Sequence, residues 1–156
     1  MVPPTSTTPT PEKEIYTALY ESRPELGDRV GTISLPSLKL NWPVFEGTTE
    51  AQLAKGVGHF VQSVLPGEAD NTVLSGHRTT VFNKLGDLAT GDTVLIKTSA
   101  GTFTYQVRSH RIVLRTDRTV IVPTETAVLT LTTCYPFNNI GATKHSYVVV
   151  ADLLEN

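Results

Sequence analysis

The sequence contains one cysteine, Cys134, and one tryptophan, Trp42. A single cysteine cannot form an internal disulfide, so the cross-links common in small secreted domains are excluded within this chain. The Cys134 thiol is therefore either a small buried group or a group present for its chemistry. A lone cysteine is more often a buried core residue than a reactive one. Only the residues around Cys134 can favour the reactive alternative.

The chain also has little excess of positive or negative charge. Thirteen Lys and Arg against fifteen Asp and Glu give a net charge of −2. This balance supplies no long-range field for a polyanion, so nucleic acid is excluded as an expected partner. No stretch approaches the roughly 20 apolar residues of a membrane helix, and no signal peptide is recognisable. The four histidines show no metal-ligand spacing with the cysteine, so no metal or other cofactor is expected.

The length of 156 residues fits one domain. Residues 1–13 contain four Thr and four Pro and almost nothing apolar, which is typical of a flexible tether. We therefore expect a tether over residues 1–13 and a single folded domain over residues 14–156.

Short strands dominate the expected secondary structure. Apolar residues at helical spacing predict one helix over Glu12–Arg23, which Pro24 would end, and shorter helices are expected over Thr49–Lys55 and Thr80–Leu85. Runs rich in Val, Ile, Leu and Thr predict strands at Val30–Leu35, Leu38–Phe45, Thr72–Ser75, Thr93–Thr98, Thr102–Leu114, Val128–Thr133 and Tyr147–Leu153. The Ser99-Ala100-Gly101 turn indicates an antiparallel hairpin. Seven or eight such strands predict an all-β fold with short helices, closed or nearly closed into a barrel.

Two segments differ from ordinary barrel strands. One runs through Gly76 to His77, and the other ends at Cys134 just before Pro136. Edges where a strand gives way to a loop are common positions for reactive groups. A nearby imidazole can raise the thiolate fraction of a cysteine and later protonate a leaving amine. Because 134 − 77 = 57 positions separate the two residues, only the fold can bring them together.

Other side chains compete for these roles. His59 follows Gly58 and precedes Phe60, where a packed and hydrogen-bonded histidine is the favoured interpretation. His110 lies in mid-strand and is expected to face solvent. Ser75 lacks the Gly-x-Ser-x-Gly frame of a serine nucleophile and is interpreted as a strand hydroxyl. His145, in a polar loop, remains a candidate.

The segment Leu74-Ser75-Gly76-His77-Arg78 resembles the catalytic-histidine segment of sortases. Thr130-Leu131-Thr132-Thr133-Cys134 matches the Thr-Leu-x-Thr-Cys signature of the same family. The resemblance extends from Arg29 to Leu153. The Cys-Tyr-Pro-Phe sequence that begins at Cys134 most resembles class D, with class E next.

This resemblance implies the eight-stranded sortase β-barrel and a cysteine transpeptidase without a cofactor. Cys134 would attack an LPxTG-like sorting signal between Thr and Gly or Ala, and a thioacyl intermediate would pass to an amine of a cell-wall precursor or a pilin. His77 would move the protons, and Thr133 would help to bind substrate. The implied location is the extracellular face of the membrane in a Gram-positive cell envelope, with an anchor before the tether.

One position departs from the family pattern. Sortases have an Arg five residues before the alanine that is Ala151 here, and 151 − 5 = 146 is Ser146. A guanidinium fork for substrate carbonyls is therefore missing at that position. Lys144 or His145 would supply a cation instead, or Ser146 is an engineered substitution, or the enzyme works without this Arg. Losing an oxyanion donor costs roughly 3 kcal/mol in other enzymes, so a slow enzyme is expected unless Lys144 or His145 substitutes for the Arg.

Two alternative functions follow from Ser146 and from the thiol chemistry. A sortase-like barrel could hold sorting peptides with weak or no turnover, or the chain could be a cysteine hydrolase in which water resolves the thioacyl group. Retention of both His77 and Cys134 argues against binding alone, because binding needs neither.

Overall fold

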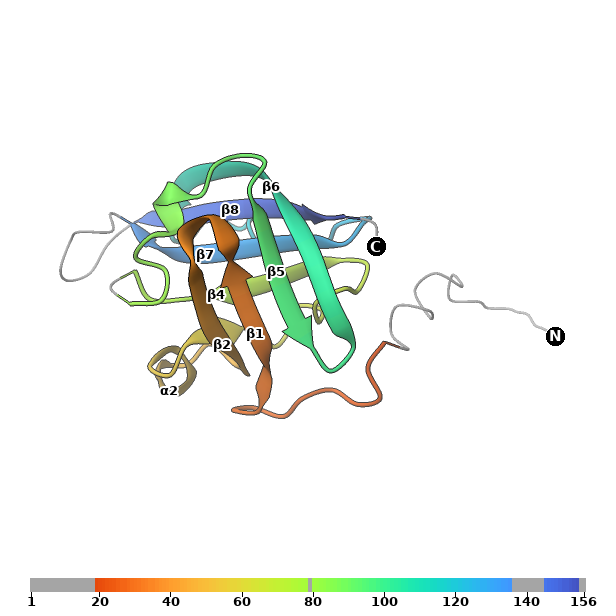
Figure 1. Ribbon diagram of the computed structural model, residues 1–156. Helices are drawn as coiled ribbons and strands as arrows, with labels where there is room; N and C mark the ends of the chain where they lie inside the picture. Colours follow the sequence, from red (N-terminus) through yellow and green to blue (C-terminus); the bar gives the residue numbers. More distant parts are fainter. Residues whose placement is uncertain (1–18, 79, 136–144, 155–156) are drawn as a thin grey trace.

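Eight strands form a closed barrel in a computed structural model that describes residues 19–78, 80–135 and 145–154 (Figure 1). The strand order around the barrel is β1-β2-β3-β4-β7-β8-β6-β5, and β1 pairs with β5 to complete the circle. The strands are β1 (Arg29–Leu35), β2 (Leu40–Glu46), β3 (Val57–His59), β4 (Asn71–Ser75), β5 (Thr93–Thr98), β6 (Gly101–Leu114), β7 (Val128–Tyr135) and β8 (His145–Leu153). The helical elements are α2 (Glu50–Leu53) and two 3₁₀ turns, η1 (Pro36–Leu38) and η2 (Leu85–Asp87). The expected all-β barrel with short helices is confirmed.

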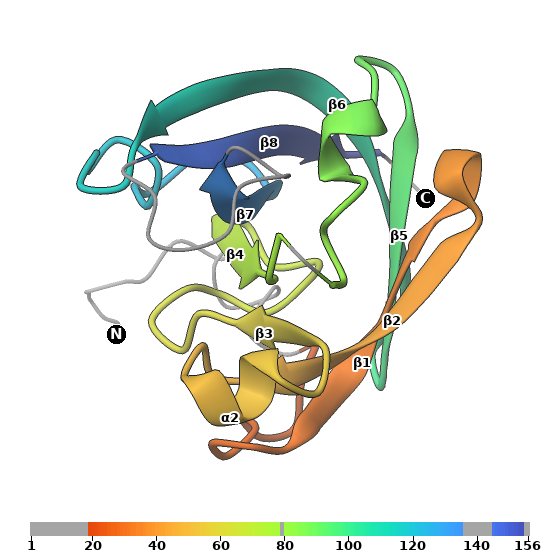
Figure 2. The ribbon, with the colours of Figure 1, turned by 90° about the vertical axis from the view of Figure 1, so that its left-hand side faces the viewer.

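Most neighbouring strands are antiparallel, but two pairs, β2 with β3 and β4 with β7, are parallel. Parallel partners run toward the same end of a barrel, so residues that follow them emerge side by side. Figure 2 looks onto the end toward which β4 and β7 run. The residues that follow β4 and those that end β7 therefore share this end of the molecule.

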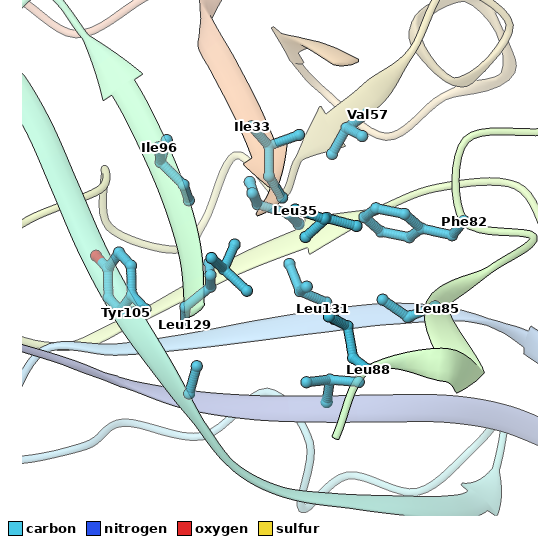
Figure 3. Packing of buried hydrophobic residues seen from close by; sticks show 14 of the residues in the cluster. Ile33, Leu35, Val57, Phe82, Leu85, Leu88, Ile96, Tyr105, Leu129 and Leu131 are labelled. Carbon is cyan, nitrogen blue, oxygen red and sulfur yellow. The ribbon is translucent and has the colours of Figure 1, made fainter. Parts of the chain in front are cut away.

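The barrel interior is filled by alternate residues of the strands. Ile33 and Leu35 in β1 and Leu129 and Leu131 in β7 are at most 1% exposed. Figure 3 shows these side chains packed together with Phe82, Leu85 and Leu88 from the segment after β4. Complete burial of an Ile, Leu or Phe side chain contributes about 1.5–3 kcal/mol. The core therefore fixes the segment after β4 against the strands.

The strand boundaries mostly agree with those expected from sequence. The hairpin of β5 and β6 is confirmed, with Thr98 opposite Gly101 at its turn. The three residues of β3 were missed as a strand because so short a run, with a glycine at its centre, has no alternating pattern. The helix expected over Thr49–Lys55 is present as the single turn α2.

Two helix predictions do not hold where the structure tests them. Residues 80–84 form turns before η2, so the helix expected over Thr80–Leu85 is wrong. Residues 19–23 are not helical, while residues 12–18 and the expected tether over residues 1–13 lie outside the described residues. In the segment after β4, the apolar residues Val81, Phe82 and Leu85 pack into the core without forming a helix.

Long-range hydrogen bonds hold the segment before β1. The Tyr20 hydroxyl donates to the Pro66 carbonyl at 2.6 Å, and Arg23 Nη1 donates to the two carboxylate oxygens of Glu68 at 2.9 and 3.1 Å. Glu68 is 2% exposed and also accepts from the Leu65 N–H at 2.7 Å. A buried carboxylate requires such partners, and here they tie the segment to the barrel.

Tyr105 makes the stability of the barrel sensitive to alkaline pH. Its ring is fully buried, its hydroxyl accepts from the Gly67 N–H at 2.9 Å, and burial raises the pKa of Tyr105 from 10.0 to about 12. The unfolded chain releases this proton at lower pH than the folded chain. The free energy of unfolding should therefore fall between pH of about 10 and 12, by up to about 3 kcal/mol for a shift of about two units.

Urea unfolding at a series of alkaline pH values measures this slope. Tyr105→Phe should reduce the slope, and Tyr20 accounts for what remains because burial also raises the pKa of Tyr20 to about 12. An equally steep slope in Tyr105→Phe would contradict the assignment.

Candidate active site

The two segments singled out in the sequence continue neighbouring parallel strands. In the pairing of β4 with β7, Ser75 lies opposite Thr132, and their hydroxyl oxygens are 2.9 Å apart in a hydrogen bond. The Gly76 N–H donates to the Thr132 carbonyl at 3.2 Å. The pairing therefore extends one residue beyond the end of β4.

This register relates His77 directly to Cys134. The pairing of Ser75 with Thr132 has an offset of 132 − 75 = 57 residues, and the offset between His77 and Cys134 is 134 − 77 = 57. The two residues thus occupy equivalent positions two residues beyond the last pair, on chains that run about 4.8 Å apart when paired. The spacing of 57 residues in the sequence is the register of the parallel strands.

Close packing around Gly76 fixes the backbone that leads to His77. A Cβ atom on Gly76 would lie 2.5 Å from Val81 Cγ2 and 2.7 Å from Phe82 Cδ2. Phe82 is fully buried in the core, so it has little room to move away. Only glycine allows the chain to pass this close to the segment that folds back over it.

His77 is held from both its backbone and its ring. Its carbonyl accepts from the N–H groups of Thr80 at 3.3 Å and Phe82 at 3.1 Å. Its side chain is 36% exposed, and Nε2 lies 3.2 Å from Oε2 of Glu50, whose side chain is 79% exposed. The imidazole is therefore accessible to a substrate while one of its nitrogens contacts a carboxylate.

Ser146 lies on β8, opposite Cys134 of β7 and opposite Val113 of β6. It lines a cavity on the face of the sheet away from the core, together with Thr132 and Val148. The other walls come from the end of β6 and the loop after it: Val113, Leu114, Arg115, Asp117, Val120 and Ile121. The position at which sortases have an arginine therefore faces a partly apolar cavity with one guanidinium and one carboxylate on its walls.

The remaining candidates are distributed over both faces. Thr133 is 5% exposed on the core side, and its Oγ1 has no hydrogen-bond partner among the residues that the structure describes. Thr133 and Ser146 therefore face opposite sides of the sheet. His145 is exposed at the start of β8, one position before Ser146, and Lys144 lies outside the described residues.

The other two histidines agree with their sequence interpretation. His59 is fully buried, with Nδ1 2.7 Å from Oε1 of Glu46 and Nε2 2.7 Å from the Val64 carbonyl. His110 is exposed on β6, and its ring stacks on Tyr147 with centroids 6.0 Å apart. His59 lies opposite Leu74 of β4, but both of its ring nitrogens are already in hydrogen bonds inside the protein, whereas His110 lies on β6.

Two charged residues at this end of the barrel were not singled out from sequence. Glu50 precedes His77 by 27 positions on a different element, and Arg115 belongs to a loop without a motif. A contact between elements so far apart in the sequence has no local pattern, and only the folded chain reveals it. Within the described ranges, no cluster of three or more His, Cys, Asp or Glu is placed to hold a metal ion. None of the described helices is long and apolar enough to span a membrane.

A closed eight-stranded barrel with a histidine after β4 and a cysteine near the end of β7 defines the class of protein. The sortase-domain model matches residues 33–154, and the chain belongs to the sortase family. The resemblance to class D is also confirmed. Sortase D of Bacillus subtilis (strain 168) is 40% identical over 128 residues, which are 81% of this chain and 65% of that protein.

Solved structures agree with this assignment. The catalytic domain of SrtD from B. anthracis is 39% identical, with a TM-score of 0.73 over 87% of this chain and 94% of that chain. Sortase A from Corynebacterium diphtheriae is 28% identical, with a TM-score of 0.77 over 95% of this chain and 70% of that chain. The chain spans between about half and two thirds of the length of the curated relatives it matches, at 65%, 49% and 60%.

The packing at Gly76 gives a test of how the site is positioned. Gly76→Ala should destabilise the fold by about 1–3 kcal/mol, because the added methyl group overlaps Val81 and Phe82 and the core resists the shift. Urea unfolding measures this cost. Gly91→Ala is a control with open space around its Cβ position, although its φ of +98° adds some strain of its own. A smaller cost at Gly76 than at Gly91 would contradict the packing argument.

Proposed function

We propose that this chain is a sortase-type cysteine transpeptidase in which Cys134 is the nucleophile and His77 is its proton partner. The observation that carries the proposal is the shared offset of 57 residues between Ser75 and Thr132 and between His77 and Cys134. Strand pairing on a packed barrel is a rigid way to hold a thiol and an imidazole together. A nucleophile beside an oriented base is the arrangement that covalent catalysis requires.

The proposed reaction has two steps, and His77 gives a proton in the first and takes one back in the second. The Cys134 thiolate attacks the carbonyl carbon of a threonine in the peptide, the C–N bond to the next residue breaks, and protonated His77 gives a proton to the leaving amine. A second amine then attacks the thioacyl carbon, loses its proton to His77 and releases the thiolate. The peptide segment is transferred from one amine to another without a net change in oxidation state.

Family membership supports the proposed substrates. We propose LPxTG-like sorting signals of surface proteins, cleaved between Thr and Gly or Ala, and an amine of a cell-wall precursor or a pilin as the acceptor. The setting would be the outer face of the membrane in a Gram-positive cell envelope. The division into a tether over residues 1–13 and a catalytic domain over residues 14–156 belongs to this proposal.

Ser146 favours a second candidate, a barrel that binds sorting peptides with weak turnover. A serine offers one neutral hydroxyl donor where an arginine offers a charged fork. Thr133 and Ser146 are proposed as substrate-binding residues, with Lys144 and His145 as the sources of a replacement cation. A hydrolase is the third candidate, because water can also resolve a thioacyl enzyme when no amine is present.

Intact-protein mass spectrometry separates these functions. The protein is incubated with LPxTG-, LPxTA- and LAxTG-type peptides, with Cys134→Ala as the control. A mass gain equal to the acyl fragment, absent in Cys134→Ala, is expected. Adding a Gly peptide or hydroxylamine should convert the adduct into a transfer product, whereas release only as the free acid would favour a hydrolase. No adduct and no cleavage would contradict both enzyme proposals.

Cys134→Ala should abolish peptide cleavage, because no other group in the proposed mechanism forms the thioacyl bond. The free energy of unfolding should change by less than about 1 kcal/mol, because the substitution is proposed to remove a reactive group rather than core packing. Chromatography measures the peptide cleavage, and calorimetry on the same samples measures the stability. Normal cleavage by Cys134→Ala would show that Cys134 is not the nucleophile.

Ser146→Arg should raise kcat/KM, because a guanidinium at this position adds donors for developing charge on the substrate carbonyl. The gain should be at least tenfold, up to about a hundredfold for a well-placed donor. Ser99→Arg, at the exposed turn between β5 and β6, adds the same charge elsewhere and serves as the control. A lower or unchanged rate for Ser146→Arg would count against the missing donor.

A further inference from the structure

The Glu50 carboxylate beside His77 has no role in the function proposed above. Oε2 of Glu50 lies 3.2 Å from Nε2 of His77, across 27 positions of sequence. We propose that Glu50 is a positioning residue that fixes the orientation and the proton arrangement of the His77 imidazole. This inference rests on the proposed function, because it matters only if His77 serves Cys134.

Hydrogen-bond chemistry determines which ring nitrogen remains for the thiol. An ionised carboxylate can only accept hydrogen bonds, so Nε2 of His77 must carry the proton that it donates to Glu50. In the neutral imidazole, Nδ1 then has the free lone pair. The contact thus leaves Nδ1 as the ring atom that can accept the thiol proton.

The backbone at Glu50 is fixed by its own element. It opens α2, and the Thr49 N–H just before it donates to Oε1 of Gln52 at 3.0 Å. Gln52 is only 7% exposed, so this turn is anchored on the protein. A Cβ atom on Gly47, where φ is +109°, would lie 2.5 Å from Leu26 Cδ1 and 2.8 Å from Gln52 Oε1. The turn that leads to Glu50 therefore depends on a glycine.

The elements that carry Glu50 and Cys134 lie on opposite sides of β4. Figure 2 shows α2 next to β3, on the side of β4 that is opposite β7. His77 follows β4, and Glu50 of α2 contacts its ring. Cys134 belongs to β7, the strand on the other side of β4. The arrangement follows the general order of nucleophile, base and orienting carboxylate.

The rate of Cys134 alkylation by iodoacetamide at neutral pH tests the inference without any substrate. This rate depends on the thiolate fraction, and Cys134 is the only thiol in the chain. Glu50→Ala should slow alkylation about two- to fivefold, a modest effect because the pair is exposed to water. Glu50→Gln, which retains an acceptor without the charge, should lie in between. Glu25→Gln removes the charge of an exposed carboxylate outside the site and should leave the rate unchanged.

A double-mutant cycle separates positioning from a general effect of charge. In a His77→Ala background, Glu50→Ala should leave the alkylation rate unchanged, because the ring through which Glu50 acts is gone. With a cleavable peptide, Glu50→Ala should lower kcat. KM should stay within about twofold of the wild-type value, since the contact does not involve substrate. Equal slowing with and without His77, or a rise in KM alone, would overturn the inference.

Failure of this inference is distinguishable from failure of the proposed function. If no peptide acylates Cys134 but the alkylation cycle behaves as described, the coupling of Glu50 to His77 and Cys134 stands and the substrate is wrong. If peptides acylate Cys134 and Glu50→Ala matches Glu25→Gln in every measurement, the proposed function stands and Glu50 has no positioning role.

Discussion

The parallel pairing of β4 with β7 is the constraint on which the site depends. Strands that run in the same direction deliver the residues that follow them to the same end of the barrel, and their register decides which residues are neighbours. Here the hydrogen bond between the hydroxyls of Ser75 and Thr132 marks that register two residues before His77 and Cys134. The other strands contribute side chains to the same buried core, and this packing keeps β4 and β7 in place.

The sequence was sufficient for some parts of this account and insufficient for others, for physical reasons. Strong local patterns predicted β5 and β6 with their hairpin, and two strand-end motifs predicted His77 and Cys134 as the candidate pair. The three residues of β3 carry no usable pattern, and the packing of Phe82 against the core replaces the helix expected after β4. Strand register, which relates His77 to Cys134, is a property of pairing and has no local code.

The arrangement of charge around the site was equally invisible before folding. Glu50 contacts His77 from α2, and Arg115 lines the same cavity as Ser146. Each belongs to an element that is distant in sequence from the residue it neighbours. Where a family motif has an arginine and this chain has Ser146, the motif identifies the difference, while the fold shows which groups surround it. Sequence motifs thus identify the candidate pair His77 and Cys134, whereas only the folded chain identifies the charged residues Glu50 and Arg115 around it.

The most direct test of the central claim is whether His77 senses the chemical state of Cys134. Imidazole ¹H–¹⁵N correlations of the four histidines, assigned with His77→Ala, can be compared before and after Cys134 is alkylated. The account predicts that the His77 ring signals shift, while those of His59, whose ring is hydrogen-bonded to Glu46 and Val64, and of His110 on β6 stay nearly in place. Unmoved His77 signals, or a larger change at His110, would contradict the claim that the register of β4 and β7 brings thiol and imidazole together.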